Sequence, residues 1–70
     1  MIRIKYKANG KDKTIIGNTM TKSKRFVMLT CPMETKIVKH MIDKACIIKI
    51  EHVKNPYGDY EVIKDITNEL

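Results

Sequence analysis

The sequence predicts an α+β domain: a small, mainly antiparallel sheet of about five strands in the order ββ-β-α-ββ, with one amphipathic helix packed on it. Three observations lead to this prediction. Alternating residues around Asn9-Gly10 are typical of a β-hairpin, an apolar run at 25–30 is typical of a central strand, and apolar residues at helical spacing over 33–45 are typical of a helix. With 70 residues, the chain is expected to form a single domain, 1–70, with a small core.

Residues 1–17 are predicted to form a basic β-hairpin. Ile2, Ile4 and Tyr6 alternate with cations, so an extended backbone places apolar side chains on one face and positive charges on the other. Asn9-Gly10 supplies the positive φ angles that a two-residue type I′ turn requires. If these two residues form the whole loop, we expect Ala8 to face Lys11, Lys7 to face Asp12 in an ion pair, Lys5 to face Thr14, and Ile4 to face Ile15.

The middle of the chain is predicted to hold a loop, a strand and a helix. Residues 18–24 are polar and lack apolar periodicity, which favours a loop. The apolar run at 25–30 is expected to lie in the middle of the sheet. The helix at 33–45 would begin at Pro32, which is tolerated in a first helical turn. Its core-facing side chains would be Met33, Ile37, Val38, Met41, Ile42 and Ala45.

The last third of the chain is predicted to return to strands. Residues 46–53 alternate with a period of two, and the Asn-Pro and Gly-Asp pairs within 54–59 indicate a turn. Residues 60–67 are rich in β-branched side chains, which favours a strand. A helix there is the alternative, because Val62, Ile63, Ile66 and Leu70 also fit a helical stripe.

The charge of the chain is strongly asymmetric. The formal net charge is +6, and residues 1–40 hold ten Lys and Arg against two Asp and Glu, whereas residues 41–70 hold four against six. Such a field favours a polyanionic partner, which could be nucleic acid, an anionic membrane surface or an acidic protein patch. The alternative is a lysine-rich surface that only keeps a small protein in solution.

The cations of the first 25 residues are the candidate binding site. The hairpin register places three of them on one strand face, with the basic loop beside it, so several phosphates could be neutralised together. The candidate residues for binding nucleic acid or another partner are Arg3, Lys5, Lys7, Lys11, Lys13, Lys22, Lys24 and Arg25. Aromatic platforms are scarce, because Tyr6 is expected to face the core and Tyr57 and Tyr60 lie far along the chain. Contact with the backbone of a duplex or a structured RNA is therefore favoured over reading of single-stranded bases.

The sequence shows no pattern typical of an enzyme or of a metal site. Cys31, His40, Cys46 and His52 have zinc-binding side chains, but they lack the closely spaced cysteine pair of most structural zinc sites. Neither cysteine lies in a recognisable nucleophile motif, and the glycines do not form a phosphate-binding loop. We therefore expect no catalytic residue, no metal and no cofactor. The cysteines are expected to be free thiols, with a disulfide between them as the alternative.

The predicted function is that of a non-catalytic binding module acting on nucleic acid or on a complex that handles nucleic acid. The alternative is a small regulatory or inhibitory protein, of the kind found in phages and mobile elements, that docks on a larger host protein. An uncovered edge strand would also permit a homodimer. The absence of a signal peptide or a long apolar stretch favours the cytoplasm and argues against a membrane location.

Overall fold

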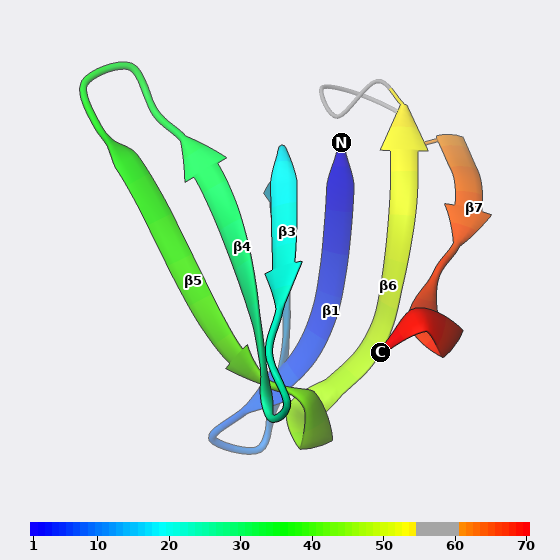
Figure 1. Ribbon diagram of the computed structural model, residues 1–70. Helices are drawn as coiled ribbons and strands as arrows, with labels where there is room; N and C mark the ends of the chain where they lie inside the picture. The colour runs from blue at the N-terminus through cyan, green and yellow to red at the C-terminus, as the bar shows by residue number, and fades with distance from the viewer. Residues whose placement is uncertain (55–60) are drawn as a thin grey trace.

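The computed structural model describes residues 1–54 and 61–70, and within these ranges the protein is all-β (Figure 1). The α+β prediction is therefore wrong: the described residues contain seven strands, two short 3-10 turns and no α-helix. No helix in these ranges is long and apolar enough to cross a membrane. The strands are β1 (Ile2–Ala8), β2 (Lys11–Gly17), β3 (Thr19–Lys22), β4 (Phe26–Pro32), β5 (Ile37–Asp43), β6 (Ile47–Lys54) and β7 (Glu61–Asp65). The 3-10 turns are η1 (Lys44–Cys46) and η2 (Thr67–Glu69).

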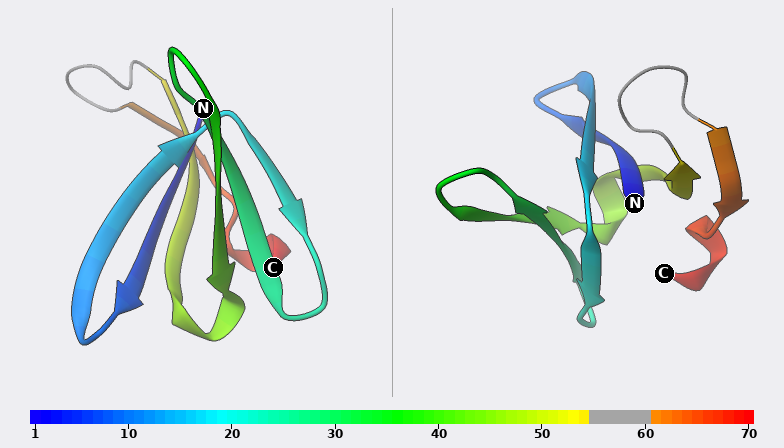
Figure 2. Two further views of the ribbon diagram at one scale, coloured as in Figure 1. Left: turned by 90° about the vertical axis from the view of Figure 1, so that its left-hand side faces the viewer. Right: turned by 90° about the horizontal axis from the view of Figure 1, so that it is seen from above.

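The strands form two antiparallel sheets. The larger sheet has the order β2-β1-β6-β7 and the smaller one the order β3-β4-β5. Figure 1 shows the sheets diverging towards the end that holds the amino terminus and coming together at the opposite end. Three connections lie at this second end, namely the β1–β2 turn, the β3–β4 turn and η1 (Figure 2).

The chain passes between the two sheets twice, at Asn18 between β2 and β3 and at η1 between β5 and β6, and the first passage is a sharp bend. β2 and β3 are separated only by Asn18, whose backbone N–H donates to the Thr30 carbonyl of β4 at 2.9 Å. A Cβ atom at Gly17 would lie 2.6 Å from both the Leu29 Cγ and the Thr30 carbonyl oxygen. Strands that change sheets at such a bend form the corners of packed β-sandwiches. Gly17 is therefore the point at which the second sheet folds onto the first.

The register of the first hairpin is confirmed in full. Ile4 pairs with Ile15, Lys5 with Thr14, Lys7 with Asp12 and Ala8 with Lys11. The turn residues Asn9 and Gly10 have φ angles of 54° and 74°, as a type I′ turn requires. Lys7 and Asp12 lie opposite each other as expected, but their charged groups are too far apart to form the predicted ion pair.

The core lies between the two sheets. Its buried side chains are Ile2, Ile4, Val27, Leu29, Ile42, Ile50 and Ile66. Half-buried side chains that pack against them are Tyr6, Ile15, Met20, Cys31 and Ile47. Both faces of the core are thus built by strands, and a covering helix is not needed.

The predicted helix at 33–45 is a turn followed by β5 and η1. Met33 N–H donates to the Lys36 carbonyl at 2.8 Å, which closes a tight turn between β4 and β5. Pro32 pairs with Ile37 at a position of the ladder where no backbone N–H is needed, so the proline is accommodated in a strand. Of the six residues assigned to the apolar stripe, Ile42 is buried and Val38 is half-buried, while Met33, Ile37, Met41 and Ala45 are exposed.

Other predicted boundaries differ less. The predicted loop at 18–24 contains β3. This strand pairs with the edge of β4 that β5 leaves open. The strands predicted at 25–30 and 46–53 are confirmed as β4 and β6 with slightly shifted ends. The strand predicted at 60–67 is confirmed as β7, which ends at Asp65 and is followed by η2. Tyr60 and the turn predicted at 55–59 lie outside the described residues.

The carboxyl-terminal segment closes one side of the core. Ile66 is buried, and its N–H donates to the Ile50 carbonyl at 2.9 Å. The Thr67 hydroxyl accepts from the Ile50 N–H at 3.0 Å and donates to the Asp65 carboxylate at 2.6 Å. This hydroxyl is the first cause of a lowered pKa at Asp65, followed by the Thr67 backbone N–H.

Candidate nucleic-acid interface

The outer face of β1 carries two of the three predicted cations in an accessible form. Lys5 and Lys7 are exposed and point away from the core, because they alternate with the buried Ile4 and the half-buried Tyr6. Lys5 lies beside Thr14 on one side and Lys49 on the other. These lysines are available to an anionic ligand.

Arg3 belongs to a buried ion pair instead. Its Nη2 lies 2.8 Å from Glu51 Oε1, and the Arg3 and Glu51 side chains are only 14% and 3% exposed. Burial acts to raise the pKa of Glu51, but the hydrogen bond and charge of Arg3, assisted by Lys49, outweigh it and hold that pKa below its ordinary value. The charge of Arg3 is therefore largely neutralised by Glu51 within the protein and is less accessible to a ligand.

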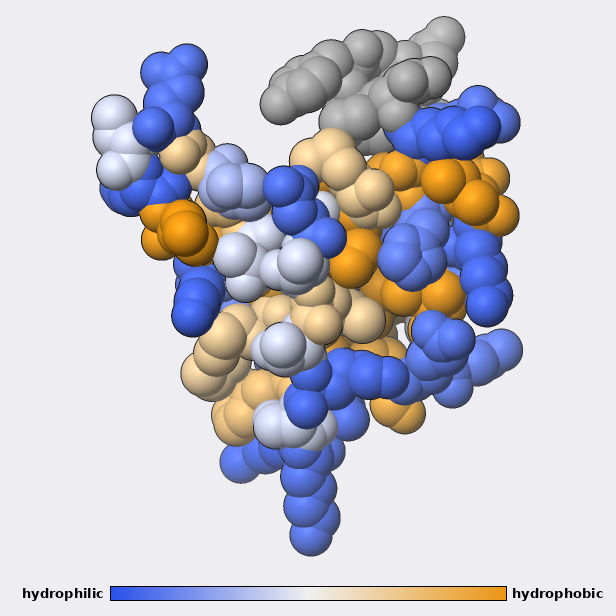
Figure 3. Space-filling model, turned by 45° about the horizontal axis from the view of Figure 1, so that its top comes forward, coloured by the Kyte–Doolittle hydropathy of each residue, from blue (hydrophilic) through white to orange (hydrophobic). Residues whose placement is uncertain are grey.

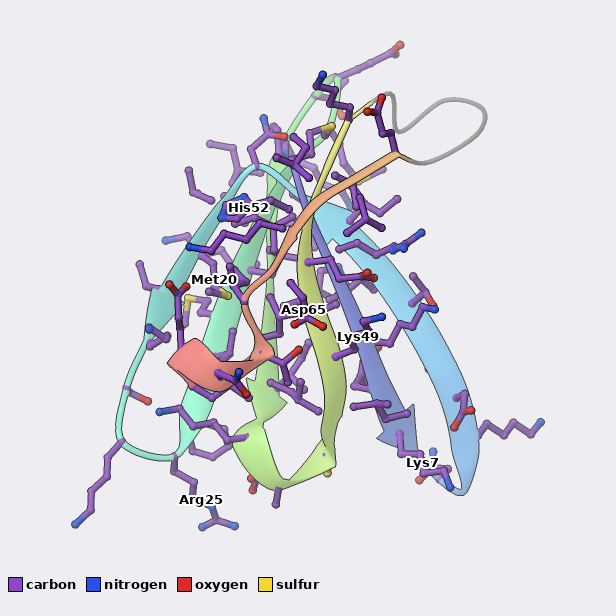
Figure 4. The ribbon with its side chains drawn as sticks, turned by 90° about the vertical axis from the view of Figure 1, so that its right-hand side faces the viewer. Lys7, Met20, Arg25, Lys49, His52 and Asp65 are labelled. Atoms are coloured by element: carbon purple, nitrogen blue, oxygen red, sulfur yellow. The ribbon has the colours of Figure 1, made fainter. Side chains whose placement is uncertain are left out.

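The neighbouring part of this face has mixed charge. Lys49 Nζ lies 3.4 Å from Glu51 Oε2, and Figure 4 shows Lys49 beside Asp65 of the neighbouring strand. The charge of Lys49 contributes to the lowered pKa of Asp65. The continuous Arg3, Lys5 and Lys7 surface expected from the sequence is thus reduced to Lys5 and Lys7.

The side chains of Lys11 and Lys13 lie on the face of the hairpin opposite to Lys5 and Lys7. Lys13 pairs with Tyr6 and Lys11 with Ala8, and directly paired residues point to the same side of a sheet. Both lysines are exposed. The distal half of the hairpin therefore carries lysines on both of its faces.

The β3–β4 turn supplies the remaining predicted cations. Lys22 Nζ donates to the Glu69 carbonyl, and Arg25 Nε lies 3.1 Å from Asp43 Oδ2. The Arg25 guanidinium also lies 5.4 Å from the centre of the Phe26 ring. Lys24 is exposed at the tip of the turn.

Asp43 is fixed by two donors. Its Oδ1 accepts from the Ala45 N–H at 2.9 Å, and its Oδ2 accepts from Arg25. The Ala45 hydrogen bond, followed by that of Arg25, lowers the pKa of the Asp43 carboxyl.

We use the name cationic end for the end of the molecule where the β1–β2 turn, the β3–β4 turn and η1 come together. Figures 1 and 2 show the three segments at this end, and Figure 4 shows Lys7 and Arg25 there, far from His52. Acidic side chains in the same segments are Asp12 and Asp43. The cations are Lys7, Lys11, Lys24, Arg25 and Lys44.

A groove of about 310 Å³ opens at the cationic end, between the hairpin and β5. Tyr6, Lys7, Ala8 and Asn9 line it from the hairpin. From the other side it is lined by His40, Met41, Ile42, Asp43 and Cys46. The groove combines apolar walls with polar groups, as small-ligand sites do.

Comparisons with known proteins add no relationship: no protein-family model, no curated protein and no solved structure matches this chain.

Sequence reasoning missed the groove and the neighbours of four titratable residues around the site. Lys49 and Glu51 alternate correctly within the predicted strand, but their closeness to Arg3 depends on the pairing of β1 with β6. His40 and Lys44 fall within the predicted helix at 33–45, whereas the structure places His40 on β5 in the groove wall and Lys44 in η1. No local pattern signals these placements.

The chemical groups at this end suit binding. Among residues 1–54 and 61–70, no three His, Cys, Asp or Glu side chains are arranged to hold a metal ion. Both cysteines are free, and burial raises the pKa of Cys31, whose Sγ lies 3.1 Å from the Ile16 carbonyl. What the cationic end offers is a group of ammonium donors for anionic oxygen atoms.

Proposed function

We propose that the protein is a non-catalytic module that binds nucleic acid, or a complex that handles nucleic acid, through the lysines of the β1–β2 hairpin and the cationic end at which this hairpin turns. One observation carries this proposal: Lys5, Lys7, Lys11 and Lys13 are exposed on one hairpin and form no ion pair within the described residues. Lysines that are not neutralised internally keep their full attraction for phosphates. The free thiols fit the reducing cytoplasm that we propose as its location.

The hairpin is suited to backbone contact. Its type I′ turn and the pairing of β1 with β2 and β6 fix the backbone that carries the lysines, so binding has to order only their side chains. Lysine ammonium groups contact phosphates as point charges and read no base edge. We therefore expect affinity for the polyanion with little sequence preference.

The first expected result concerns salt. If the four hairpin lysines each neutralise one phosphate, log K for a short DNA duplex should fall against log salt with a slope of about −3.6. Between roughly 50 mM and 200 mM salt, the dissociation constant should then rise about 100-fold. Fluorescence anisotropy with labelled duplex DNA and duplex RNA measures this. Absence of binding at the lower salt concentration, or binding indifferent to salt, would refute the proposal.

A pair of matched variants tests where the ligand binds. Lys7→Gln with Lys11→Gln should flatten the salt slope by about 1.8, because two phosphate contacts are lost. Lys36→Gln with Lys54→Gln removes the same charge from exposed positions at the opposite end of the molecule and should change the slope little. An equal effect of both pairs would show that only net charge matters.

A second candidate function, docking on a larger protein, is favoured by β5. Ile37 and Met41 are 67% and 60% exposed, and β5 is an edge strand. The bond from Lys44 N–H to the Arg25 carbonyl and the Met33 to Lys36 bond set the ladder phase, so the backbone groups of Ile37, Lys39 and Met41 point away from β4. Such an edge can accept a strand from another chain, including a second copy. Figure 3 shows apolar surface on the β4–β5 hairpin and, separately, on β7.

The docking candidate has its own expected result. A protein held by the immobilised chain after nuclease treatment should no longer be held by the Ile37→Lys variant, because an exposed apolar contact on the edge strand is replaced by a charge. The oligonucleotide affinity of that variant should not fall. Loss of all bound protein after nuclease treatment would contradict docking and leave nucleic acid as the ligand.

A further inference from the structure

We propose that the groove between the β1–β2 hairpin and β5 binds an unpaired nucleobase while the hairpin lysines hold the adjoining phosphates. This inference rests on the proposed function and names the form of nucleic acid that the cationic end prefers. Its ligand is a single-stranded segment, a bulge or a strand end, in which a base is free to leave the stack.

The groove has the size and position that such a ligand needs. Its volume of about 310 Å³ lies within the range of small-ligand pockets. It opens at the cationic end, and Lys7 belongs to its own lining. A base in the groove would therefore bring its own backbone to the lysines.

Tyr6 provides a ring on the hairpin side of the groove. It is half-buried, because it packs against the core cluster and also lines the groove. The sequence predicted that Tyr6 faces the core, and the structure shows that it also lines the groove. A ring that is already held by the core offers a stacking partner at low cost in entropy, and stacking on aromatic side chains is how proteins hold unpaired bases.

The lysines are distributed so that a strand can pass the groove on the hairpin side. Lys13 and Lys11 point to the same face of the ribbon as Tyr6 and Ala8, their direct cross-strand partners. Tyr6 and Ala8 both line the groove. Phosphates on either side of an inserted base would thus meet Lys11 or Lys13 on this face and Lys7 at the rim.

The unpaired cations give the ligand a direction. Asp43, on the β5 side of the groove, accepts from the Ala45 N–H and is paired with Arg25, whereas Lys7, Lys11 and Lys13 on the hairpin side form no ion pair within the described residues. The phosphate backbone is therefore expected to run along the hairpin, with the base edge facing β5. His40 and Asn9 add polar groups to the lining for contact with that edge.

The deciding experiment compares two labelled single strands of equal length, one of ordinary nucleotides and one with an abasic site at every position. The two carry the same phosphates, so they differ only in bases. Wild-type protein should bind the base-bearing strand at least about tenfold more tightly, as expected from one stacked base. The Tyr6→Leu variant should lose this preference, and Tyr6→Phe, which keeps the ring, should retain it.

Each outcome separates the groove from the wider proposal. Equal binding of both strands by the wild type, measured without any variant, would overturn the base site while leaving phosphate binding intact. Retention of the full preference by a folded Tyr6→Leu protein would also overturn it. Binding of neither strand, nor of duplex, would refute the proposed function itself. The Lys7→Gln, Lys11→Gln variant should weaken both strands by the same factor, because it removes only phosphate contacts.

Discussion

Replacing Gly17 with alanine is expected to lower the free energy of unfolding by about 3 kcal/mol, the upper part of the range for overpacking a tight site. The added methyl group would lie 2.6 Å from both Leu29 Cγ and the Thr30 carbonyl oxygen. Leu29 is a fully buried core residue and the Thr30 carbonyl is backbone, so neither can move without displacing β4. For a domain of this size, we expect the midpoint of thermal unfolding to fall by about 15 °C, measured by circular dichroism.

Gly10→Ala is the matched control for this change. Gly10 also accepts a methyl group with difficulty, because its φ angle is 74°, but no atom lies within 4 Å of the added Cβ. The cost should therefore be only the backbone strain of about 1 kcal/mol. If Gly17→Ala destabilised the protein no more than Gly10→Ala does, the close approach of β4 to Gly17 would not be what fixes the bend between β2 and β3.

The first hairpin could be predicted from sequence because everything that determines it is local. Alternation over β1 sets which side chains are buried, and Asn9-Gly10 sets the turn and hence the register. No other part of the chain is needed to reach the correct pairing. The same reasoning located β4 and β6, whose patterns are short and apolar or strictly alternating.

The helix prediction failed because the pattern at 33–45 fits two structures and a distant contact decides between them. Ile37, Val38 and Ile42 are β-branched and favour a strand, yet their spacing also fits one face of a helix. β4 has a free edge that β5 fills, and β3 fills the other. Once both edges of β4 are paired, the second sheet covers the first without a helix.

The candidate site was predictable only as far as it depends on the hairpin. The local register placed Lys5 and Lys7 correctly on the outer face. The neutralisation of Arg3 could not be seen, since its partner Glu51 lies 48 positions along the chain. The groove likewise needs β5 as a strand, because His40 and Asp43 reach the hairpin only in that arrangement.

Replacing Glu51 with alanine is expected to cost about 3 kcal/mol of stability, near the lower end of the range for removing one partner of a buried ion pair. The Glu51 side chain is 3% exposed, whereas Arg3 and Lys49 keep 14% and 43% of their side-chain surface in contact with solvent. Solvent therefore compensates part of the charge left behind. Denaturant unfolding at neutral pH measures the loss, and a change under 1 kcal/mol would contradict a structural role for this pair.

The pH dependence separates the charge of Glu51 from its packing. Because the folded protein holds the pKa of Glu51 below its ordinary value of 4.5, the charge contributes stability above that value and loses it as the pH falls through the folded pKa. Glu51→Gln keeps the shape and an oxygen acceptor for Arg3 but lacks the charge at every pH. The stability difference between wild type and Glu51→Gln should thus be full at neutral pH and shrink in acid. Asp43 and Asp65, whose pKa values are also lowered, titrate equally in both proteins and cancel from the comparison. A difference that stayed constant down to acid pH would mean that packing, and not the ion pair with Arg3, is what Glu51 contributes.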